Sequence, residues 1–374
     1  MRTARSLTVT VPTPLSLCSL NRQHIIVRAG LTALPGSKSK GLEKKMKRIS
    51  HIIAVLMLIC VAFISCERED MNRPDEQNGR PIEFVVESEW PEMTKAATTI
   101  NAFKVWGNWT KDPNDVSNTS GIKEAVFGTT GAAVNKYGNT WVLTQEADWH
   151  QGYYNFAAVS PSSFSGSQDA TFNMVKVGDQ NVPRYTNLLT IDLGEDGLDL
   201  SNTQADLMYA FSCVNNSGND ADAVSLMFKH AFARVTVKLG YTESEPTVNS
   251  FIIYGIHTRI NGELKFRYEQ TGYGVSAVRT SIDNLSELLS HGEVSTEEVP
   301  YYTGTSFTSA DDEIILVDNL LVFPETFSET CYLGIKMNVT VNGQTKDVYA
   351  NVTSGEWLSG ESYAYKLDAD SIEM

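Results

Sequence analysis

The chain has few of the residues on which most enzymes and metal proteins depend: 5 cysteines and 6 histidines among 374 residues. No cysteines stand in a CxxC pair, and no histidines form HxH or HExxH, so the spacing predicts no structural zinc site and no metalloprotease centre. The nucleophile elbow GxSxG and the phosphate-binding loop GxxxxGK[ST] are also missing. We therefore expect no catalytic residue, no metal and no cofactor.

Acidic residues are common, but they form no calcium-loop pattern. Paired carboxylates such as Glu195-Asp196 and Asp220/Asp222 lie in polar runs, where loop acids are usually solvated. Two distant carboxylates could build a glycosidase, yet the sequence nominates no pair. Enzymatic activity is therefore the function that the sequence supports least.

Long apolar runs are missing too, with one exception. Residues 52–64 form an apolar stretch of about 13 residues, whereas a membrane span needs about 20. Lys47 and Arg48 precede it, so residues 46–65 are interpreted as a signal peptide. Its end, Phe63-Ile64-Ser65-Cys66, resembles a lipobox and predicts lipidation, with palmitate among the acyl groups, at Cys66. An ordinary signal peptide, or a membrane anchor with a chance cysteine, is the alternative.

Basic residues are concentrated before the predicted cleavage point. Ten of the 30 basic and one of the 45 acidic residues precede Cys66, which leaves 20 basic and 44 acidic residues and a net charge of −24. So acidic a surface repels polyanions, which excludes nucleic acid as a partner. Residues 1–45 are basic and precede a complete signal peptide, so we interpret them as a misassigned start.

Two cysteines remain after Cys66, namely Cys213 and Cys331. They could pair in an oxidising compartment or remain as two buried thiols, and the sequence leaves both possibilities open.

The rest of the chain has the pattern of an all-β protein. Residues 66–81 are polar and predict a flexible tether. Strands are predicted at 82–86, 103–106, 153–159, 207–211, 224–228 and 233–239. Asn261-Gly262 and Asn342-Gly343 predict hairpins, because a type I′ turn requires positive φ angles. One short helix is predicted within 281–291, with Ser281 as its N-cap.

Many short strands and few helices favour β-sandwiches. The polar run at 215–222 places a domain boundary near Asn219. We expect an N-terminal sandwich at 82–219 and a C-terminal sandwich at 220–374.

Three segments resemble the fimbrillin family. They are 206–210, 224–237 and the C-terminal 357–367, which matches the family's W-x-x-G-x-x-Y-x-Y ending. The resemblance implies two tandem transthyretin-like (Greek-key) β-sandwich domains. It also implies export as a lipoprotein to the cell outer membrane and assembly with other subunits into type V surface fimbriae that serve cell adhesion, with a host protein or glycan as a possible ligand.

In this family, shaft subunits lose their lipid and first strand to a trypsin-like protease, and the open groove accepts a neighbour's strand. An unpaired strand edge over an apolar groove explains this physically. Here Ile82, Phe84 and Val86 form the candidate displaced strand, and Lys95-Ala96 is the candidate processing site. Lys95 could equally be an ordinary exposed lysine.

The acidic residues 368–374 would make a poor donor strand, which favours an accessory, tip or anchor-like subunit over a shaft subunit. The alternative function is a surface glycan-binding lipoprotein, suggested by the tryptophans: Trp90, Trp106, Trp109, Trp141, Trp149 and Trp357. That function would need several of their faces exposed together.

Overall fold

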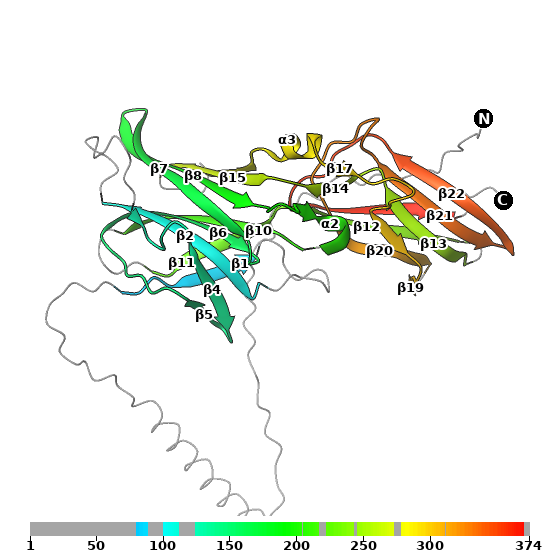
Figure 1. Ribbon diagram of the computed structural model, residues 1–374, viewed down its shortest axis with the longest axis horizontal. Helices are drawn as coiled ribbons and strands as arrows, with labels where there is room; N and C mark the ends of the chain where they lie inside the picture. The colour runs from blue at the N-terminus through cyan, green and yellow to red at the C-terminus, as the bar shows by residue number, and fades with distance from the viewer. Residues whose placement is uncertain are drawn as a thin grey trace, which may run out of the picture. The chain divides into compact units, whose positions relative to one another are not determined.

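The computed structural model describes residues 80–88, 100–111, 124–203, 205–216, 222–242, 245–272, 278–310 and 312–369. Cys66, Lys95, Ala96 and Trp90 lie outside the described residues, as does the predicted signal peptide. Nearly all regular structure is β, which confirms the all-β prediction (Figure 1). Within the described ranges, no helix combines the length and the apolar character that crossing a membrane requires.

The largest sheet follows the order β1-β11-β10-β6-β2-β4-β5, and β3 pairs with β2. Its strands are β1 (Phe84–Ser88), β2 (Ala102–Thr110), β3 (Glu124–Ala125), β4 (Ala132–Tyr137), β5 (Thr140–Leu143), β6 (Gly152–Ser160), β10 (Met208–Asn216) and β11 (Val224–His230). Every pairing in this sheet is antiparallel except that of β1 with β11. β1 therefore closes one edge of the sheet as a parallel strand.

Four smaller sheets complete the β-structure. Their orders are β16-β15-β8-β7, β17-β14-β9, β19-β20-β12-β23 and β18-β13-β21-β22. The bounds are β7 (Ser165–Val177), β8 (Gln180–Asp192), β9 (Leu198–Asp199), β12 (Ala233–Gly240), β13 (Thr247–Tyr254), β14 (His257–Ile260), β15 (Glu263–Thr271), β16 (Val278–Ile282), β17 (Glu293–Val294), β18 (Tyr302–Gly304), β19 (Thr308–Ala310), β20 (Glu313–Val322), β21 (Leu333–Val341), β22 (Gln344–Val352) and β23 (Ser362–Asp368). Two short helices occur among the described residues: α2 (Leu200–Thr203) and α3 (Leu285–Ser290).

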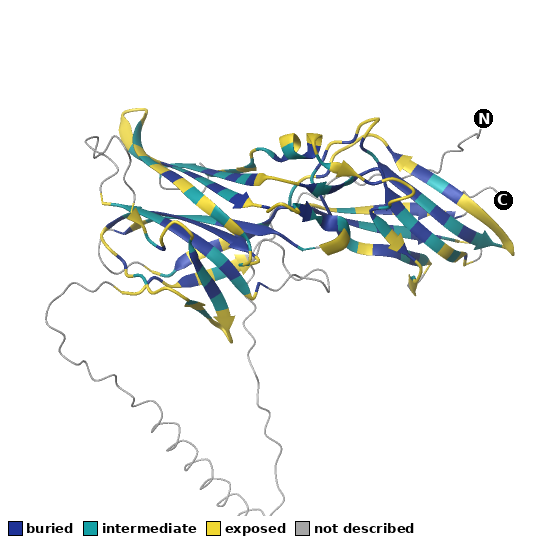
Figure 2. Cartoon of the chain, viewed as in Figure 1, coloured by how far each residue is buried: buried dark blue, intermediate teal, exposed yellow. Residues whose placement is uncertain are grey.

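Two apolar cores lie on opposite faces of the largest sheet. One core takes Phe103 and Phe156 from the sheet, and the other takes Trp106 and Val159. This is why β6 is buried almost along its whole length, and why its sequence is a nearly continuous apolar run. In strands such as β11 and β15, buried residues alternate with more exposed ones, as one-sided burial requires (Figure 2).

The two Asn-Gly predictions have different outcomes. Asn342 and Gly343 have φ angles of 51° and 79° between the paired strands β21 and β22, which confirms that hairpin. The hairpin predicted at Asn261-Gly262 is wrong, because β14 and β15 do not pair with each other. Gly262 does have a positive φ, but β15 turns away to pair with β8. A local turn signal does not determine which strands become partners.

The predicted helix is present as α3, but its N-cap is Asn284 and not Ser281. Ser281 belongs to β16, whose pairing with β15 extends the strand beyond the expected helix start. The Asn284 side chain bonds the backbone of β15, accepting from Lys265 N at 2.9 Å and donating to Glu263 O at 2.7 Å. These bonds attach the start of α3 to the sheet.

The division into two sandwiches near residue 219 stays a prediction. β11 follows that position and pairs with β1 and β10 of the largest sheet. β15, which also follows it, pairs with β8. Strands from both sides of residue 219 thus share sheets.

Candidate functional site

The first strand, β1, lies at the edge of the largest sheet and buries one of its faces. Ile82 and Phe84 are only 4% and 6% exposed, Val86 is half-buried, and Val85 is 48% exposed. The predicted strand is therefore present, although it begins at Phe84 and not at Ile82, and its alternation is confirmed. Phe84 lies opposite Val224 and Val86 opposite Leu226, both of them buried.

An aromatic cluster lies beneath β1. The ring centroid of Phe84 is 5.8 Å from that of Phe103, 6.0 Å from that of Phe156 and 6.3 Å from that of Phe127. All three partners are buried. If β1 left the sheet, it would uncover this cluster and the backbone edge of β11 together.

A few backbone bonds attach the start of this segment. Val224 N donates to Glu83 O at 2.8 Å, Ile82 N donates to Ala147 O at 2.8 Å, and Trp149 N donates to Arg80 O at 2.9 Å. The chain then passes from β1 into residues 89–99, which carry the candidate processing site and lie outside the described residues.

The C-terminal motif has a structural role. Trp357 is buried and its Nε1 donates to the Tyr365 hydroxyl at 2.9 Å, while the Tyr363 hydroxyl accepts from Leu358 N at 2.8 Å. Gly360 N donates to Phe232 O at 3.0 Å. The motif thereby attaches β23, which runs parallel to β12 at a sheet edge, to the core that includes Trp106 and Val159.

Three buried charged or ionisable residues meet where β11 passes into β12. The Asp206 carboxylate lies 2.8 Å from His230 Nδ1 and accepts from Arg234 Nη2 at 3.0 Å. Their side chains are between 2% and 5% exposed. The shared carboxylate therefore connects the end of β11 with the start of β12.

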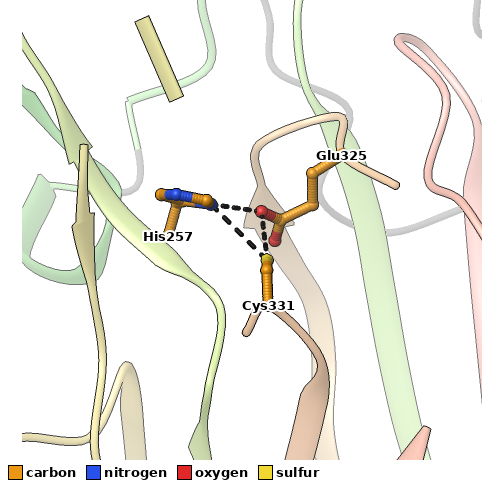
Figure 3. Close-up of side chains that lie close together, drawn as sticks. All are labelled: His257, Glu325 and Cys331. Atoms are coloured by element: carbon orange, nitrogen blue, oxygen red, sulfur yellow. Dashed lines mark hydrogen bonds and ion pairs between the residues drawn. The ribbon is translucent and has the colours of Figure 1, made fainter. Parts of the chain in front are cut away.

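A second polar cluster brings together residues that are far apart in the sequence: His257 at the start of β14, Glu325 after β20, and Cys331 before β21 (Figure 3). Glu325 Oε2 is 2.5 Å from His257 Nδ1 and accepts from Cys331 Sγ at 2.8 Å. Cys331 Sγ is 3.5 Å from His257 Nδ1. Among the described residues, it is the group whose His, Cys and acidic ligand atoms lie close enough to hold a metal ion.

The chemistry of this cluster does not favour a thiol nucleophile. Burial, with the negative Glu325 beside the sulfur, raises the pKa of the Cys331 thiol. A reactive cysteine needs a lowered pKa and a base that takes its proton. Here the thiol proton points to the carboxylate, and the imidazole presents the same nitrogen to both partners.

Sequence reasoning did not find this cluster. His257 is 68 residues from Glu325 and 74 from Cys331, so no spacing motif connects them. Neither His257 nor Cys331 lies beside a strand predicted from the sequence, so no sequence signal pointed to the cluster.

The two cysteines do not bond to each other. Cys213 Sγ on β10 donates to Asn155 Oδ1 on the neighbouring strand β6 at 2.6 Å, and burial raises the pKa of the Cys213 thiol. Cys331 belongs to the cluster with Glu325, and both thiols are free. Of the possibilities that the sequence left open, the structure shows two free thiols.

Most of the tryptophans are inside the protein. Trp106, Trp149 and Trp357 are at most 2% exposed, and Trp109 and Trp141 are half-buried. None of the five tryptophans in the described part of the chain is in the exposed class.

The comparisons with known proteins agree with this architecture. The model of the fimbrillin-like family matches residues 93–373. Among curated proteins, none matches the chain.

Several solved structures are similar in outline. A candidate cell adhesion protein from Bacteroides ovatus is 15% identical, with a TM-score of 0.39 over 78% of this chain and 92% of its own. The fimbrial anchor protein Mfa2 from Porphyromonas gingivalis is 11% identical, with a TM-score of 0.28 over 77% and 91%. A candidate polysaccharide-binding protein from Bacteroides thetaiotaomicron is 13% identical, with a TM-score of 0.33 over 77% and 90%. Because these identities and TM-scores are low, the assignment of the chain to a family depends on the match to the family model and not on these structures.

Proposed function

Since the chain belongs to the fimbrillin-like family, we propose that it is a structural and adhesive subunit of cell-surface fimbriae, assembled with other subunits by β-strand addition. In this proposal Cys66 carries the lipid that holds the subunit in the outer membrane. The protein binds a partner surface and catalyses no reaction.

The observation that carries the proposal is the edge position of β1. This strand has one partner strand among the described residues, β11, and pairs with it in parallel. Phe84 of this strand, with Ile82 just before it, covers the aromatic cluster described above. An incoming strand that offered apolar residues at the same alternation would restore both the backbone bonds and the buried surface.

An accessory, tip or anchor-like position is favoured over the shaft. Tyr365 and Leu367, the apolar residues nearest the acidic tail, are buried in the subunit's own core. They are therefore not free for donation to a neighbour.

Glycan binding remains the less supported alternative. The tryptophans that suggested it are buried or half-buried wherever the structure describes them. A host protein or glycan could still be the adhesive ligand of the fimbria.

The first prediction concerns processing at Lys95. We expect the subunit in the outer membrane to begin with an acylated Cys66 and the subunit in sheared filaments to begin at Ala96. Mass spectrometry of both fractions measures the two N-termini. The variant Lys95→Ala should lose the filament form, while Lys104→Ala, in β2, the next strand along the chain, should keep it. Filaments whose subunits still begin at Cys66 would rule out this site.

The second prediction tests strand exchange itself. Val85 and Ser225 lie opposite each other on β1 and β11, and both are exposed. Neighbouring strands lie about 4.8 Å apart, within the Cα separation that a disulfide spans. We expect the double variant Val85→Cys/Ser225→Cys to retain β1 when oxidised, and therefore to form no polymers.

The same protein provides its own control, because reduction should restore polymer formation to the wild-type level. Single variants Val85→Cys and Ser225→Cys should assemble normally under both conditions. Native gels and electron microscopy of filaments give the readout. If the oxidised variant polymerises as well as the reduced one, release of β1 is not part of assembly, whatever happens at Lys95.

A further inference from the structure

The cluster of His257, Glu325 and Cys331 has a set of ligand types that proteins use for zinc. Imidazole nitrogen, thiolate sulfur and carboxylate oxygen are all ligands of Zn²⁺, whereas a thiolate is a poor ligand for Ca²⁺ or Mg²⁺. One thiolate and one carboxylate would balance the charge of a divalent ion, and the imidazole would bind in its neutral form. The occupied site would carry no net charge, which suits its buried position.

The distances between the three side chains fit such a site. With Zn–N near 2.0–2.1 Å and Zn–S near 2.3 Å, a tetrahedral ion separates nitrogen and sulfur by about 3.5 Å. Cys331 Sγ and His257 Nδ1 are 3.5 Å apart. Glu325 Oε2 lies 2.5 Å from the nitrogen and 2.8 Å from the sulfur, as a hydrogen-bonded carboxylate does. A shift of that oxygen by less than about 1 Å would admit the ion.

The second oxygen of Glu325 is an independent sign of a missing ligand. The side chain is 3% exposed, and its Oε1 is buried without a hydrogen-bond partner among the described residues. Buried polar atoms are nearly always satisfied, so one that is not needs an explanation. A cation bound at this carboxylate would provide it.

The backbone around the cluster is well fixed. Ser328 N donates to Cys331 O at 2.7 Å, and Trp357 N donates to Glu325 O at 2.9 Å. A Cβ on Gly292 would lie 2.7 Å from Arg259 O and 3.1 Å from the ring of His257, so glycine leaves the space that this ring occupies. All three ligands are thus positioned before any ion binds, as a metal site requires.

The cluster also opens onto a cavity. His257, Glu325 and Cys331 line a cavity of about 670 Å³ together with Thr326, Glu356 and Trp357. This gives an ion a path to the site and leaves room for a water molecule as a further ligand. A site with three protein ligands and one open position is the usual form of an accessible zinc centre.

We propose that His257 Nδ1, Glu325 and Cys331 Sγ bind one zinc-class divalent ion, with a fourth coordination position directed into this cavity. Binding releases the Cys331 thiol proton to solvent, moves the proton of the neutral imidazole from Nδ1 to Nε2, and replaces the two hydrogen bonds to Glu325 with metal–ligand bonds. This site is separate from the strand-exchange groove, so its test does not depend on fimbrial assembly.

The test uses the full chain without a histidine tag, freed of metal by a chelator that is then removed. We expect calorimetric titration with ZnCl₂ to give one equivalent per chain. Co²⁺ should bind in its place and give a thiolate-to-metal absorption band with the strong visible bands of a tetrahedral ion. Near 100 times its Kd, Zn²⁺ should raise Tm by about 4 °C or more.

Matched variants separate the cluster from adventitious binding. Cys331→Ser and Glu325→Gln should weaken Zn²⁺ binding by at least about tenfold, as the loss of supporting or direct ligands does. Cys213→Ser removes the other free thiol and should bind like the wild type. If the two cluster variants fail to fold, the Co²⁺ spectrum of the wild type still tests whether a thiolate binds the metal.

Three results would overturn the proposal. They are no stoichiometric Zn²⁺ binding by the wild type, a Co²⁺ complex without the thiolate band, and equal affinity in wild type and both folded cluster variants. Tighter binding of Ca²⁺ than of Zn²⁺ would contradict the assignment of the ion class.

Discussion

Replacing Phe84 by alanine should lower the free energy of unfolding by about 3–5 kcal/mol, the usual cost of removing a buried phenylalanine side chain. Phe84 is 6% exposed and contacts the rings of Phe103, Phe127 and Phe156. A cavity at this position would remove the main apolar contact that holds β1 at the sheet edge. Guanidinium denaturation of the purified chain measures the change.

The Phe84→Ala substitution should destabilise β1 and β11 locally as well as lower the stability of the whole protein. β11 shares backbone bonds with β1 from Val224 to Phe228, so its amide protons should exchange faster in the variant. Val85→Ala provides the matched control, because Val85 lies on the opposite face of the same strand and is 48% exposed. We expect that substitution to cost less than about 0.5 kcal/mol. Equal effects of the two substitutions would mean that Phe84 does not anchor the strand.

This asymmetry between Phe84 and Val85 was predictable from the sequence. Along a strand, Ile82, Phe84 and Val86 share one face, and Val85 shares the other with the charged Glu83, which indicates the exposed face. The Asn342-Gly343 hairpin was predictable for a similar reason, since both residues have the positive φ angles that the turn demands. Both features depend on residues adjacent in the chain.

Features that depend on distant residues could not be predicted. The Asn261-Gly262 link looks like a hairpin locally, but Glu263 pairs with Asp192, some seventy residues earlier in the chain. Likewise, no sequence pattern near His257 predicts that Glu325 and Cys331 will contact it. The topology of the sheets creates this cluster, and topology is decided by the sum of many weak contacts.

The role of the edge strand β1 also depends on residues that are distant in the sequence. The sequence indicates that residues 82–86 form a strand, and the resemblance to fimbrillins implies that this strand is exchangeable. Only the structure shows that this strand pairs in parallel with β11 and that it covers the aromatic cluster. The physical case for strand addition therefore depends on packing and not on a motif.

The buried charges at the β11–β12 junction lead to the second large prediction. Replacing Asp206 by alanine should lower the free energy of unfolding by about 3–5 kcal/mol, because it leaves His230 and Arg234 buried without the carboxylate that they share. These side chains are at most 5% exposed, so water cannot readily replace the lost partner. Guanidinium denaturation again measures the change, with near-ultraviolet circular dichroism as the check that the variant folds.

An exposed ion pair provides the control for this effect. Arg184 and Glu269 are 3.4 Å apart with side chains 44% and 31% exposed, and both belong to paired strands of one sheet. Glu269→Ala should cost less than about 1 kcal/mol, since water screens the pair and solvates the charge that remains. A cost for Asp206→Ala within this smaller range would show that the junction does not depend on its central carboxylate. A large cost would instead show that the junction between β11 and β12 is held by charge as well as by apolar packing.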